Sequence, residues 1–306
     1  MPRSSSPPAV LCAGIAVQDI VFRVAQFAAP GGKCMANDFK VVSGGCAVNA
    51  AIAVARLGGR AFYSGPLGDT DDGVSNQLLI QLRREGIGTE GVVRVPGANA
   101  PVSGIMVDAS GERMIVTYRD KTIESARVPD PDRVVTGASL LLADNRFPNF
   151  VRPICEAARR RGIPVVLDAD RPTVEDDPLF LVPTHVIFSS ECLRATTGLD
   201  DLGAGLLRMM SHTDAFLAVS DGPGPVRYLA NGAVRTLPVF AVETIDTLAA
   251  GDVFHGGIAL ALAEGYDEVS AMRFGAAAAG LKCTRFGGSM GAPRRDEVEA
   301  FLARQR

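Results

Sequence analysis

The stretch Asp246–Phe254 reads DTLAAGDVF, and the apolar run Gly256–Ala263 follows it directly. Small residues closed by an acid predict a tight turn, almost free of side chains, that opens a buried helix. The first backbone N–H groups of a helix have no intrahelical acceptor, and they carry the positive end of the helix dipole. This stretch therefore predicts a binding site for an anion at the start of the helix.

Asp252 is expected in the first turn of that helix, beside the bound anion. A carboxylate would repel the ligand of a simple phosphate site, but it can act as the base that takes a proton from an attacking hydroxyl. Phosphoryl transfer is therefore the first hypothesis. The alternative is structural, because Gly and Ala also allow close helix packing and Asp near a helix start is favoured for its charge alone.

The length, net charge and composition of the chain limit the classes of protein to which it can belong. With 306 residues the chain is long enough for one large α/β domain or two ordinary ones. Its net charge of −3 provides no broad basic surface, so neither nucleic acid nor an acidic membrane is expected as a partner. Six cysteines without C-x-x-C pairs and three histidines disfavour a zinc site or a disulfide framework and fit a reducing cytoplasm.

Neither a leader nor a membrane span is predicted. Residues 1–8 are rich in Ser and Pro and lack the apolar core of a signal peptide, so a disordered tail is expected there. No later run approaches the roughly 20 apolar residues of a membrane-spanning helix. We expect a cytoplasmic protein with one folded unit over residues 9–306.

The run Ala9–Ala16 is short and apolar, which is typical of a buried strand. Asp19 follows where this strand is expected to end. Ligands of open α/β sheets collect beyond the carboxyl ends of the strands, so Asp19 is a candidate acceptor for a ligand hydroxyl. An ordinary turn acid is the alternative.

Gly44 and Gly45 precede the small and apolar run Ala47–Leu57, which predicts a buried helix. The two glycines allow a ligand to approach the backbone closely, and Asn49 lies one turn into the helix. An Asn among apolar residues needs a hydrogen-bond partner, and a sugar hydroxyl would serve. Backbone groups that satisfy the same amide are the alternative.

A second, smaller sheet is predicted outside the main one. The run Lys33–Val42 is typical of an exposed strand, and Pro101–Asp108 with Glu112–Arg119 predicts a hairpin. These strands are inserted at about residues 19–43 and 101–120. Such an appendage is well suited to act as a lid.

Short apolar runs alternate with helical segments from Ser139 to Val219. This alternation indicates an α/β fold with a doubly wound, mostly parallel sheet and helices on both faces. Asn231-Gly232 then separates two strand-like runs and predicts a type I′ hairpin. The sequence has no G-x-x-x-x-G-K-[ST] motif, which excludes a P-loop.

Two motifs together resemble the signatures of the ribokinase family of sugar kinases, which includes fructokinases and B-type phosphofructokinases. They are Gly44-Gly45-x-x-x-Asn49 with Leu57-Gly58, and Asp246–Asp252. Two ordered signatures about 200 residues apart are far more specific than either alone. The resemblance covers about residues 10–301 and implies a ribokinase-like fold and an ATP-dependent sugar kinase.

The resemblance also implies roles for individual residues. Asp252 would be the catalytic base, and an anion hole would stabilise the charge that develops on the transferred phosphoryl group. The backbone of this anion hole would come from Ala249, Ala250, Gly251 and Asp252. The residues that hold the sugar would be Asp19, Gly44, Gly45 and Asn49.

Further residues are implied to bind the nucleotide and a monovalent cation. The nucleotide-binding residues would be Ser220, Gly222, Thr247, Gly251, His255 and Gly288. Asp246 and the carbonyl group of Leu248 would hold a monovalent cation such as K⁺. The charge of that cation would stabilise the adjacent anion hole.

Mg²⁺ is expected together with ATP, but the chain departs from the family pattern here. Many members carry Asn-x-x-Glu before the helix that ends in Thr-Gly. Counted back from Thr197-Gly198, these places hold Ser189 and Cys192. Mg²⁺ would then be held mainly by nucleotide phosphates and water, or by Glu191.

Several runs resemble one branch of the family, the bacterial sulfofructose kinases, among them Gly32-Lys33, Ala143-Asp144-x-Arg146 and Leu281–Arg285. In that branch a Lys of the lid and an Arg bind the sulfonate with help from an Asn, and Thr117 stands at the place of that Asn. The resemblance implies that Lys33 and Arg146 converge on an acidic group of the sugar. A solvated surface role for Lys33 is the alternative.

The sequence thus predicts an ATP-dependent kinase for a primary hydroxyl of an anionic ketose such as 6-deoxy-6-sulfofructose. A kinase for a neutral or carboxylated sugar, such as ribose, fructose or 2-keto-3-deoxygluconate, is the alternative among enzymes. A sugar- and nucleotide-binding regulator without turnover is the alternative of another class, although a sensor needs no base such as Asp252. As in family dimers, a homodimer formed through the lid is expected.

Overall fold

The structure is a computed structural model that describes residues 7–305, and its centre is an eight-stranded sheet. The strands are β1 (Ala9–Ala13), β4 (Arg60–Ser64), β9 (Leu140–Asp144), β10 (Val165–Ala169), β11 (His185–Ser189), β12 (Phe216–Asp221), β13 (Gly224–Ala230) and β14 (Ala233–Leu237). Their order in space is β14-β13-β12-β11-β10-β9-β1-β4. The strands from β12 to β4 pair in parallel, and β13 and β14 extend the sheet as an antiparallel hairpin.

The apolar runs of the sequence form the middle of this sheet. Every residue of β1, β9 and β10 is buried. Parallel strands covered on both faces need such nearly continuous apolar sequence. Two hydrophobic clusters, one on each face of the sheet, make up the main core. The predicted doubly wound, mostly parallel α/β fold is therefore confirmed.

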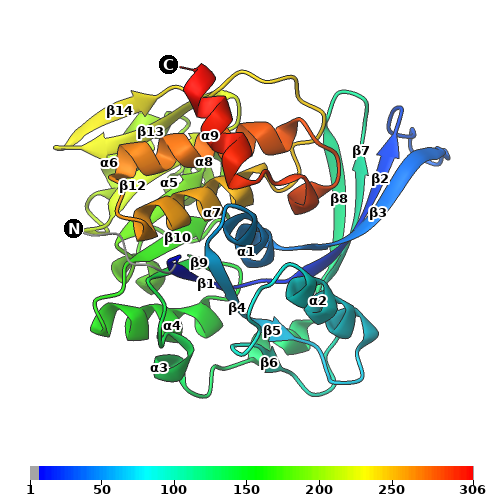
Figure 1. Ribbon diagram of the computed structural model, residues 1–306, viewed down its shortest axis with the longest axis horizontal. Coiled ribbons are helices and arrows are strands. Elements are labelled where there is room, and N and C mark those ends of the chain that lie inside the picture. The colour runs from blue at the N-terminus through cyan, green and yellow to red at the C-terminus, as the bar shows by residue number, and fades with distance from the viewer. Residues whose placement is uncertain (1–6, 306) are drawn as a thin grey trace.

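Helices cover both faces of the sheet (Figure 1). The helices packed on one face are α1 (Cys46–Arg56), α7 (Ala250–Ala263) and α8 (Glu268–Cys283), and those on the other face are α4 (Pro148–Arg160), α5 (Ser190–Thr197) and α6 (Leu202–Met209). The remaining helices are α2 (Gly73–Arg84), α3 (Pro131–Val134), α9 (Arg295–Arg304) and the 3₁₀ helices η1 (Lys121–Ser125), η2 (Pro178–Leu181) and η3 (Gly288–Gly291).

A separate four-stranded sheet stands beside the main one, and we call it the lid sheet. Its strands are β2 (Val17–Val24), β3 (Ala36–Gly44), β7 (Val102–Val107) and β8 (Arg113–Tyr118), in the order β3-β2-β7-β8. Figure 1 shows it on the right, rising away from the helices. The short strands β5 (Pro66–Leu67) and β6 (Val93–Arg94) form a third sheet.

Glycines allow α1, α7 and α8 to pack closely. A Cβ atom on Gly256 of α7 would lie 2.7 Å from the backbone oxygen of Ala50 in α1. A Cβ atom on Gly257 would lie 2.8 Å from the Cα of Gly275 in α8. Real Cβ atoms almost never approach so closely, and a larger side chain would force the helices apart. The small residues after Phe254 therefore fix how the start of α7 meets α1.

Two local predictions are wrong. Asp19 does not follow the first buried strand: β1 ends at Ala13, and Asp19 lies inside β2 of the lid sheet. A bend at Gly14 leads the chain from β1 of the main sheet into β2 of the lid sheet. The exposed strand predicted from Lys33 begins at Ala36 instead, because Lys33 belongs to the loop between β2 and β3.

The predicted type I′ hairpin is confirmed. The hairpin around Asn231-Gly232 has φ values of 52° and 71° at these residues, as a type I′ turn requires. Of the disordered tail predicted at residues 1–8, residues 1–6 lie outside the described range. Among residues 7–305, no helix combines the length and apolarity needed to cross a membrane.

Candidate active site

The start of α7 is an open cradle of backbone N–H groups. Ala249 precedes the helix with φ 64°, a left-handed conformation that costs an alanine about 1 kcal/mol. No side chain caps the helix, and the N–H groups of Gly251 and Asp252 have no acceptor among residues 7–305. A Cβ atom on Gly251 would meet nothing within 4 Å. An anion can therefore approach these N–H groups directly.

Asp252 lies in the first turn of α7 and is held from α1. The Asn49 side-chain amide donates a hydrogen bond of 2.7 Å from Nδ2 to Oδ2 of Asp252. This bond joins the two sequence motifs, whose members are 203 residues apart. Asn49 thus contacts the acid itself, and its buried Oδ1 atom has no partner in the described part of the chain.

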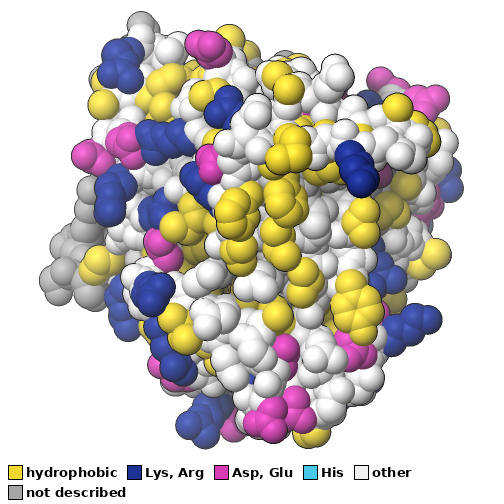
Figure 2. All heavy atoms as spheres, turned by 90° about the vertical axis from the view of Figure 1, so that its right-hand side faces the viewer, with side chains coloured by type: hydrophobic (Ala, Val, Ile, Leu, Met, Phe, Trp, Pro, Cys, Tyr) yellow, Lys and Arg dark blue, Asp and Glu magenta, His cyan; other side chains and the backbone are white. Residues whose placement is uncertain are grey.

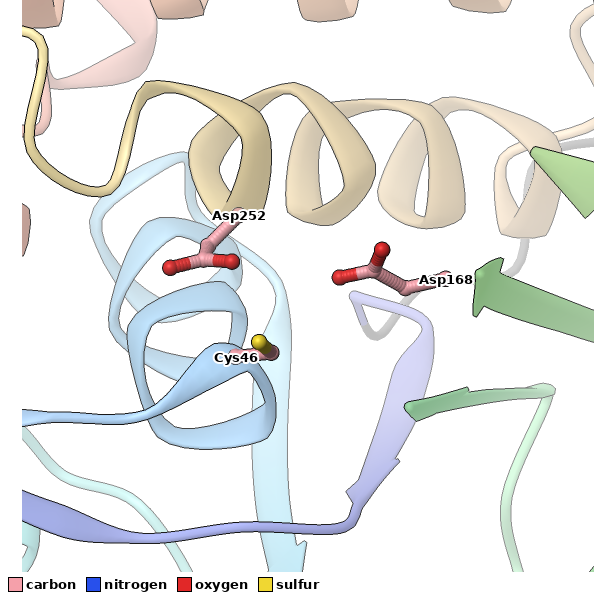
Figure 3. Close-up of side chains that lie close together, drawn as sticks. All are labelled: Cys46, Asp168 and Asp252. Atoms are coloured by element: carbon pink, nitrogen blue, oxygen red, sulfur yellow. The ribbon is translucent and has the colours of Figure 1, made fainter. Parts of the chain in front are cut away.

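Figure 3 shows Asp168 and Asp252 with their carboxyl groups pointing toward each other, and Cys46 at the start of α1 beside them. One ligand atom from each of the three lies within 4.8 Å of the other two. Asp168 is 4% exposed, and its Oδ1 atom is without a partner in the described structure. Burial, reinforced by the charge of Asp252, raises the pKa of Asp168 well above its usual value. A cation bound between Asp168 and Asp252 would therefore be favourable.

His255 corrects the sequence prediction. Its ring is 3% exposed, and Nδ1 lies 3.4 Å from Oδ2 of Asp168. Burial lowers the pKa of His255 to about 4, while the charge of Asp252 acts in the opposite direction. A neutral ring buried behind Asp168 is not available to a nucleotide. The prediction was wrong because His255 lies one turn beyond the open start of α7.

Asp19 belongs to a polar row across the lid sheet. It is paired with Ser103 of β7, and Ser103 is paired with Thr117 of β8. The Ser103 and Thr117 hydroxyl oxygens are 2.9 Å apart. Burial raises the pKa of Asp19 to about 7; its hydrogen bond with Ser103 lowers it, and the charge of Asp252 adds to the rise. The structure thus brings Asp19 and Thr117 to one face of the lid sheet, with Asp19 near Asp252.

The two glycines before α1 are needed for this arrangement. A Cβ atom on Gly44 would lie 1.9 Å from Oδ2 of Asp19. Gly45 has φ 91°, and a Cβ atom there would lie 2.5 Å from the backbone oxygen of Ile15. Only glycine allows both the backbone conformation and the close approach. The pair therefore positions the start of α1 against β2, next to Asp19.

Arg146 lies just beyond the carboxyl end of β9, as expected. Its guanidinium group forms an ion pair with Asp170. Its backbone N–H donates to Asp144, whose carboxylate also accepts from Ile15 and from Ala47 in α1. Burial raises the pKa of Asp144 to about 7, against these hydrogen bonds. Asp144 therefore ties β1, β9 and α1 together at this edge of the sheet.

Lys33 is not brought together with Arg146 within the chain. It is exposed in the loop that joins β2 to β3. β2 runs outward from Asp19, and the β2–β3 pairing extends to Val24 and Ala36 at the distal end of the hairpin. Lys33 therefore lies beyond the end of the hairpin that is remote from Asp19 and Gly44. The predicted clamp of two cations is not formed by one chain in this structure.

The other residues predicted to bind nucleotide differ in burial: Gly222 and Gly251 are exposed, Ser220 and Thr247 are half-buried, and Gly288 is buried. Ser220 lies near the carboxyl end of β12, and Gly222 follows with φ 55° and open space around it. Thr247 contacts the lid sheet, because Arg113 of β8 donates to its carbonyl oxygen at 3.1 Å and to Oγ1 at 3.0 Å. Gly288 begins η3, on the other side of the turn before α7.

The residues predicted to hold metal ions lie in different surroundings. Glu191 is exposed in the first turn of α5 and forms no ion pair with the described residues. At Asp246, the ammonium group of Lys282 lies 3.3 Å from Oδ2 and donates to the carbonyl oxygen at 2.6 Å. Both side chains are completely buried. The predicted monovalent-cation site at Asp246 and Leu248 is thus wrong in one respect, since a cation of the chain itself is already in contact with Asp246.

Sequence reasoning missed two residues of this region, Asp168 and Lys282. Asp168 ends a buried strand at the same edge of the sheet as Asp144, a position at which polar side chains often meet a ligand. Lys282 is a lone charge in a helix of small and apolar residues. A charged residue in such a setting signals a buried partner. Either signal could have been found without the structure.

The main sheet, the open helix start and the acid beside it define a phosphoryl-transfer enzyme of α/β architecture. Residues 8–295 match the model of the pfkB family carbohydrate kinases, so the chain belongs to this family. Ribokinase from Bacillus subtilis is 29% identical over 277 residues, which are 88% of this chain and 90% of that protein. Fructokinase from Solanum tuberosum is 25% identical over 287 residues, 87% of this chain and 88% of that protein.

Solved structures show the same fold. A candidate ribokinase from Agrobacterium tumefaciens superposes with a TM-score of 0.92 at 35% identity, over 98% of this chain and 99% of that one. Fructokinase from Xylella fastidiosa, solved with bound ATP, has a TM-score of 0.79 at 26% identity, over 97% and 98% of the two chains. The chain is a carbohydrate kinase with a ribokinase-like fold.

The raised pKa of Asp19 predicts a pH dependence of stability. The folded carboxyl group titrates at about 7 and the unfolded one near 3.8. The folded state thus binds more protons between these values, and this group's contribution to stability falls as the pH rises through them. We expect Asp19→Asn to gain stability relative to the wild type between about pH 4 and pH 8, on the order of 3 kcal/mol, in urea unfolding.

Asp108 provides the matched control for Asp19. It lies in an exposed turn, where hydrogen bonds from Ser110 and Glu112 lower its pKa. Between about pH 4 and pH 8 the Asp108 carboxyl group is ionised in both the folded and the unfolded state, so the stability difference between Asp108→Asn and the wild type should stay nearly constant over this range. An Asp19→Asn difference that stays constant with pH would show that Asp19 is not a proton-binding site of the folded state.

Proposed function

We propose that the chain transfers the γ-phosphoryl group of ATP to a primary hydroxyl of a sugar, with Asp252 as the base. The observation that carries this proposal is the carboxylate of Asp252, fixed by Asn49 beside an open backbone cradle. Asp252 takes the proton of the sugar hydroxyl while its oxygen bonds to the γ-phosphorus and the bond to ADP breaks. The N–H groups of Gly251 and Asp252 stabilise the charge of the transferred group.

ATP would lie along the turns that contain Ser220, Gly222, Thr247 and Gly288. Mg²⁺, when bound with ATP, neutralises phosphate charge and orients the γ-phosphoryl group. Oδ1 of Asp168, like Oδ1 of Asn49, is buried without a partner among residues 7–305, and the Asp168 carboxyl group points toward that of Asp252 (Figure 3). Nucleotide phosphates, water and Asp168 would therefore hold Mg²⁺, with the exposed Glu191 at the start of α5 as the other candidate protein ligand.

The sugar would lie between the lid sheet and the start of α1. Asp19 and Thr117 present oxygen atoms on the inner face of the lid sheet, and Gly44 and Gly45 open the backbone beside them. A carboxylate accepts hydrogen bonds from sugar hydroxyls and orders them for reaction. We propose that residues 9–306 act as one unit, with the inserted strands at about residues 19–43 and 101–120 as its lid.

We propose an anionic ketose such as 6-deoxy-6-sulfofructose as the sugar. This choice is supported by Arg146 at the carboxyl end of β9 and by the runs that resemble sulfofructose kinases. A guanidinium group binds planar and tetrahedral anions through paired hydrogen bonds. Thr117, at the place of an Asn in that branch, can still donate one hydrogen bond to an acidic group.

A neutral sugar such as ribose or fructose is the second candidate. It is favoured by the ion pair of Arg146 with Asp170, which already compensates the one arginine charge. Asp19, Asp144 and Asp168 add further acidic groups around the site. An anionic sugar must displace Asp170 or find a second cation, and Lys33 does not provide it within the same chain.

Arg146→Gln separates the two candidates. For an anionic ketose, the variant should raise KM by about tenfold or more, because a charge-assisted contact is lost, with little effect on fructose. The measurement is ADP release with 6-deoxy-6-sulfofructose, fructose, ribose, fructose 6-phosphate and 2-keto-3-deoxygluconate. Arg152→Gln, a half-exposed arginine of α4 paired with Glu156, is the control. Equal effects on all sugars favour a neutral substrate, and no turnover with any sugar contradicts the kinase proposal.

We propose that two chains form a homodimer through the outer face of the lid sheet. Figure 2 shows hydrophobic side chains gathered on this side of the molecule. Exposed hydrophobic residues on the outer face of the lid sheet are Phe22, Phe39, Val41, Met114, Val116 and Tyr118. A contiguous apolar patch on a soluble protein marks an interaction surface, and a second copy offers the same surface in return.

Val116→Asp tests this interface. Val116 is 72% exposed, so a charge there should leave the folded chain intact but place an unpaired carboxylate in the dimer contact. We expect the variant to sediment as a monomer at concentrations at which the wild type is a dimer. Leu181→Asp is the matched control, because Leu181 is 73% exposed in η2, outside the lid sheet. A wild type that sediments as a monomer, or a dimeric Val116→Asp, contradicts the proposed interface.

A reducing compartment, as in the cytoplasm, is the proposed location. All six cysteines are free thiols, and Cys12, Cys155 and Cys192 are buried. Unpaired thiols persist where glutathione and thioredoxin keep them reduced. The charge and composition of the chain agree with small-molecule partners and do not favour nucleic acid.

A further inference from the structure

Lys282 and Asp246 form a completely buried ion pair behind the start of α7. Lys282 lies in the last turn of α8, and both side chains are 0% exposed. The ammonium group lies 3.3 Å from Oδ2 of Asp246 and donates a hydrogen bond of 2.6 Å to its carbonyl oxygen. Such a pair is stable only when further hydrogen bonds satisfy both groups.

Backbone N–H groups satisfy the rest of the Asp246 carboxylate. Oδ1 accepts from Leu248 at 2.8 Å, and Oδ2 accepts from Gly287 at 2.9 Å and Gly288 at 3.1 Å. The two glycines have φ values of 110° and 60°, which turn their N–H groups toward one point. The N–H of Asp246 in turn donates to the end of α8 at Cys283. The carboxylate thus connects α8, η3 and the turn before α7.

Only three residues, Thr247, Leu248 and Ala249, separate Asp246 from the anion cradle at the start of α7. Leu248, fixed by Asp246, precedes Ala249, the alanine in left-handed conformation. Thr247, on the other side of Leu248, accepts the N–H of Ala250 at 3.1 Å. The carboxylate of Asp246 therefore stabilises the strained turn that carries the anion cradle. Without a partner, the negative charge of Asp246 would repel an anion bound in the cradle. The ammonium group of Lys282 compensates this charge.

We propose that Lys282 is a built-in cation that positions the turn 246–250 and takes the place of a bound monovalent cation. Its ammonium group supplies the positive charge beneath the anion cradle. The kinase therefore works without K⁺ or Na⁺. Lys282 acts through the turn and touches neither sugar nor nucleotide, so it is a positioning residue.

The contacts of Asp246 do not fit a bound K⁺ in addition. K⁺ needs a shell of several oxygen atoms, and the carbonyl oxygen and Oδ2 of Asp246 both lie against the ammonium group already. The remaining contacts of the carboxylate come from N–H groups, which repel a cation. Burial lowers the pKa of Lys282, and the charge of Asp246 opposes this shift. A second positive charge would be unfavourable beside Lys282.

The first experiment uses the wild-type protein. Activity and thermal unfolding are measured in KCl, NaCl and choline chloride at one ionic strength. We expect activity to differ by less than about twofold among the three salts and the unfolding temperature to stay constant. The part of the proposal about activity rests on the proposed function, whereas the unfolding temperature reports the cation site alone. Failure of the kinase proposal and failure of this inference are therefore distinguishable.

Lys282→Ala and Lys282→Met form the decisive pair. Alanine removes the charge and leaves space next to Asp246, so K⁺ or NH₄⁺ can enter. Methionine removes the charge but fills most of the space. We expect Lys282→Ala to lose activity by about tenfold or more in choline chloride, with partial recovery in KCl. K⁺ should also raise its unfolding temperature by about 2 °C or more. In Lys282→Met, K⁺ should neither restore activity nor raise the unfolding temperature.

Lys40→Ala is the matched control. Lys40 of β3 donates to the carbonyl oxygen of Phe286 at 3.2 Å, close to Gly287, but does not contact Asp246. Its loss should not make the protein respond to K⁺. A wild type activated severalfold by K⁺, or a folded Lys282→Ala whose activity and unfolding temperature ignore K⁺, overturns the proposal. If Lys282→Ala does not fold, the wild-type measurement still decides.

Discussion

The hydrogen bond from Asn49 to Asp252 is the interaction on which the rest of the site depends. It joins the starts of two helices that come from opposite ends of the chain. These helices can approach only because Gly256 places no Cβ atom against Ala50. The contact between α1 and α7 also orients the open start of α7 toward the edge of the main sheet at which β9 and β10 end. Packing of small residues and placement of the base are therefore one structural feature.

The site contains several acidic groups, and all but Asp168 are compensated, each in a different way. Asp252 is held by Asn49, Asp170 by Arg146, and Asp246 by Lys282 and three N–H groups. Asp144 accepts backbone N–H groups of three segments. Oδ1 of Asp168 has no such partner in the described part of the chain, and burial and the charge of Asp252 raise the pKa of this carboxyl group. It is the place at which a nucleotide-bound cation would relieve the charge.

The fold and half of the site could be predicted because they follow from local sequence. Apolar runs such as Val10–Ala13 and Leu140–Ala143 specify buried parallel strands, and the glycines before Asn49 and Asp252 specify open helix starts. Asp19 was placed wrongly because the chain bends at Gly14 into a second strand, and a local apolar pattern does not show that this strand belongs to another sheet. The pairs Asp168–His255 and Lys282–Asp246 could not be predicted, since each depends on which helix end meets which strand end in space.

The most direct test of the account is the turnover of Asp252→Asn together with its affinity for ATP. Asparagine keeps the size of the side chain but cannot accept the proton of the sugar hydroxyl. We predict that ADP release in the presence of the sugar falls by about 100-fold or more, while calorimetric binding of ATP is nearly unchanged. Turnover close to that of the wild type would contradict the assignment of Asp252 as the base and, with it, the mechanism derived from the α7 cradle.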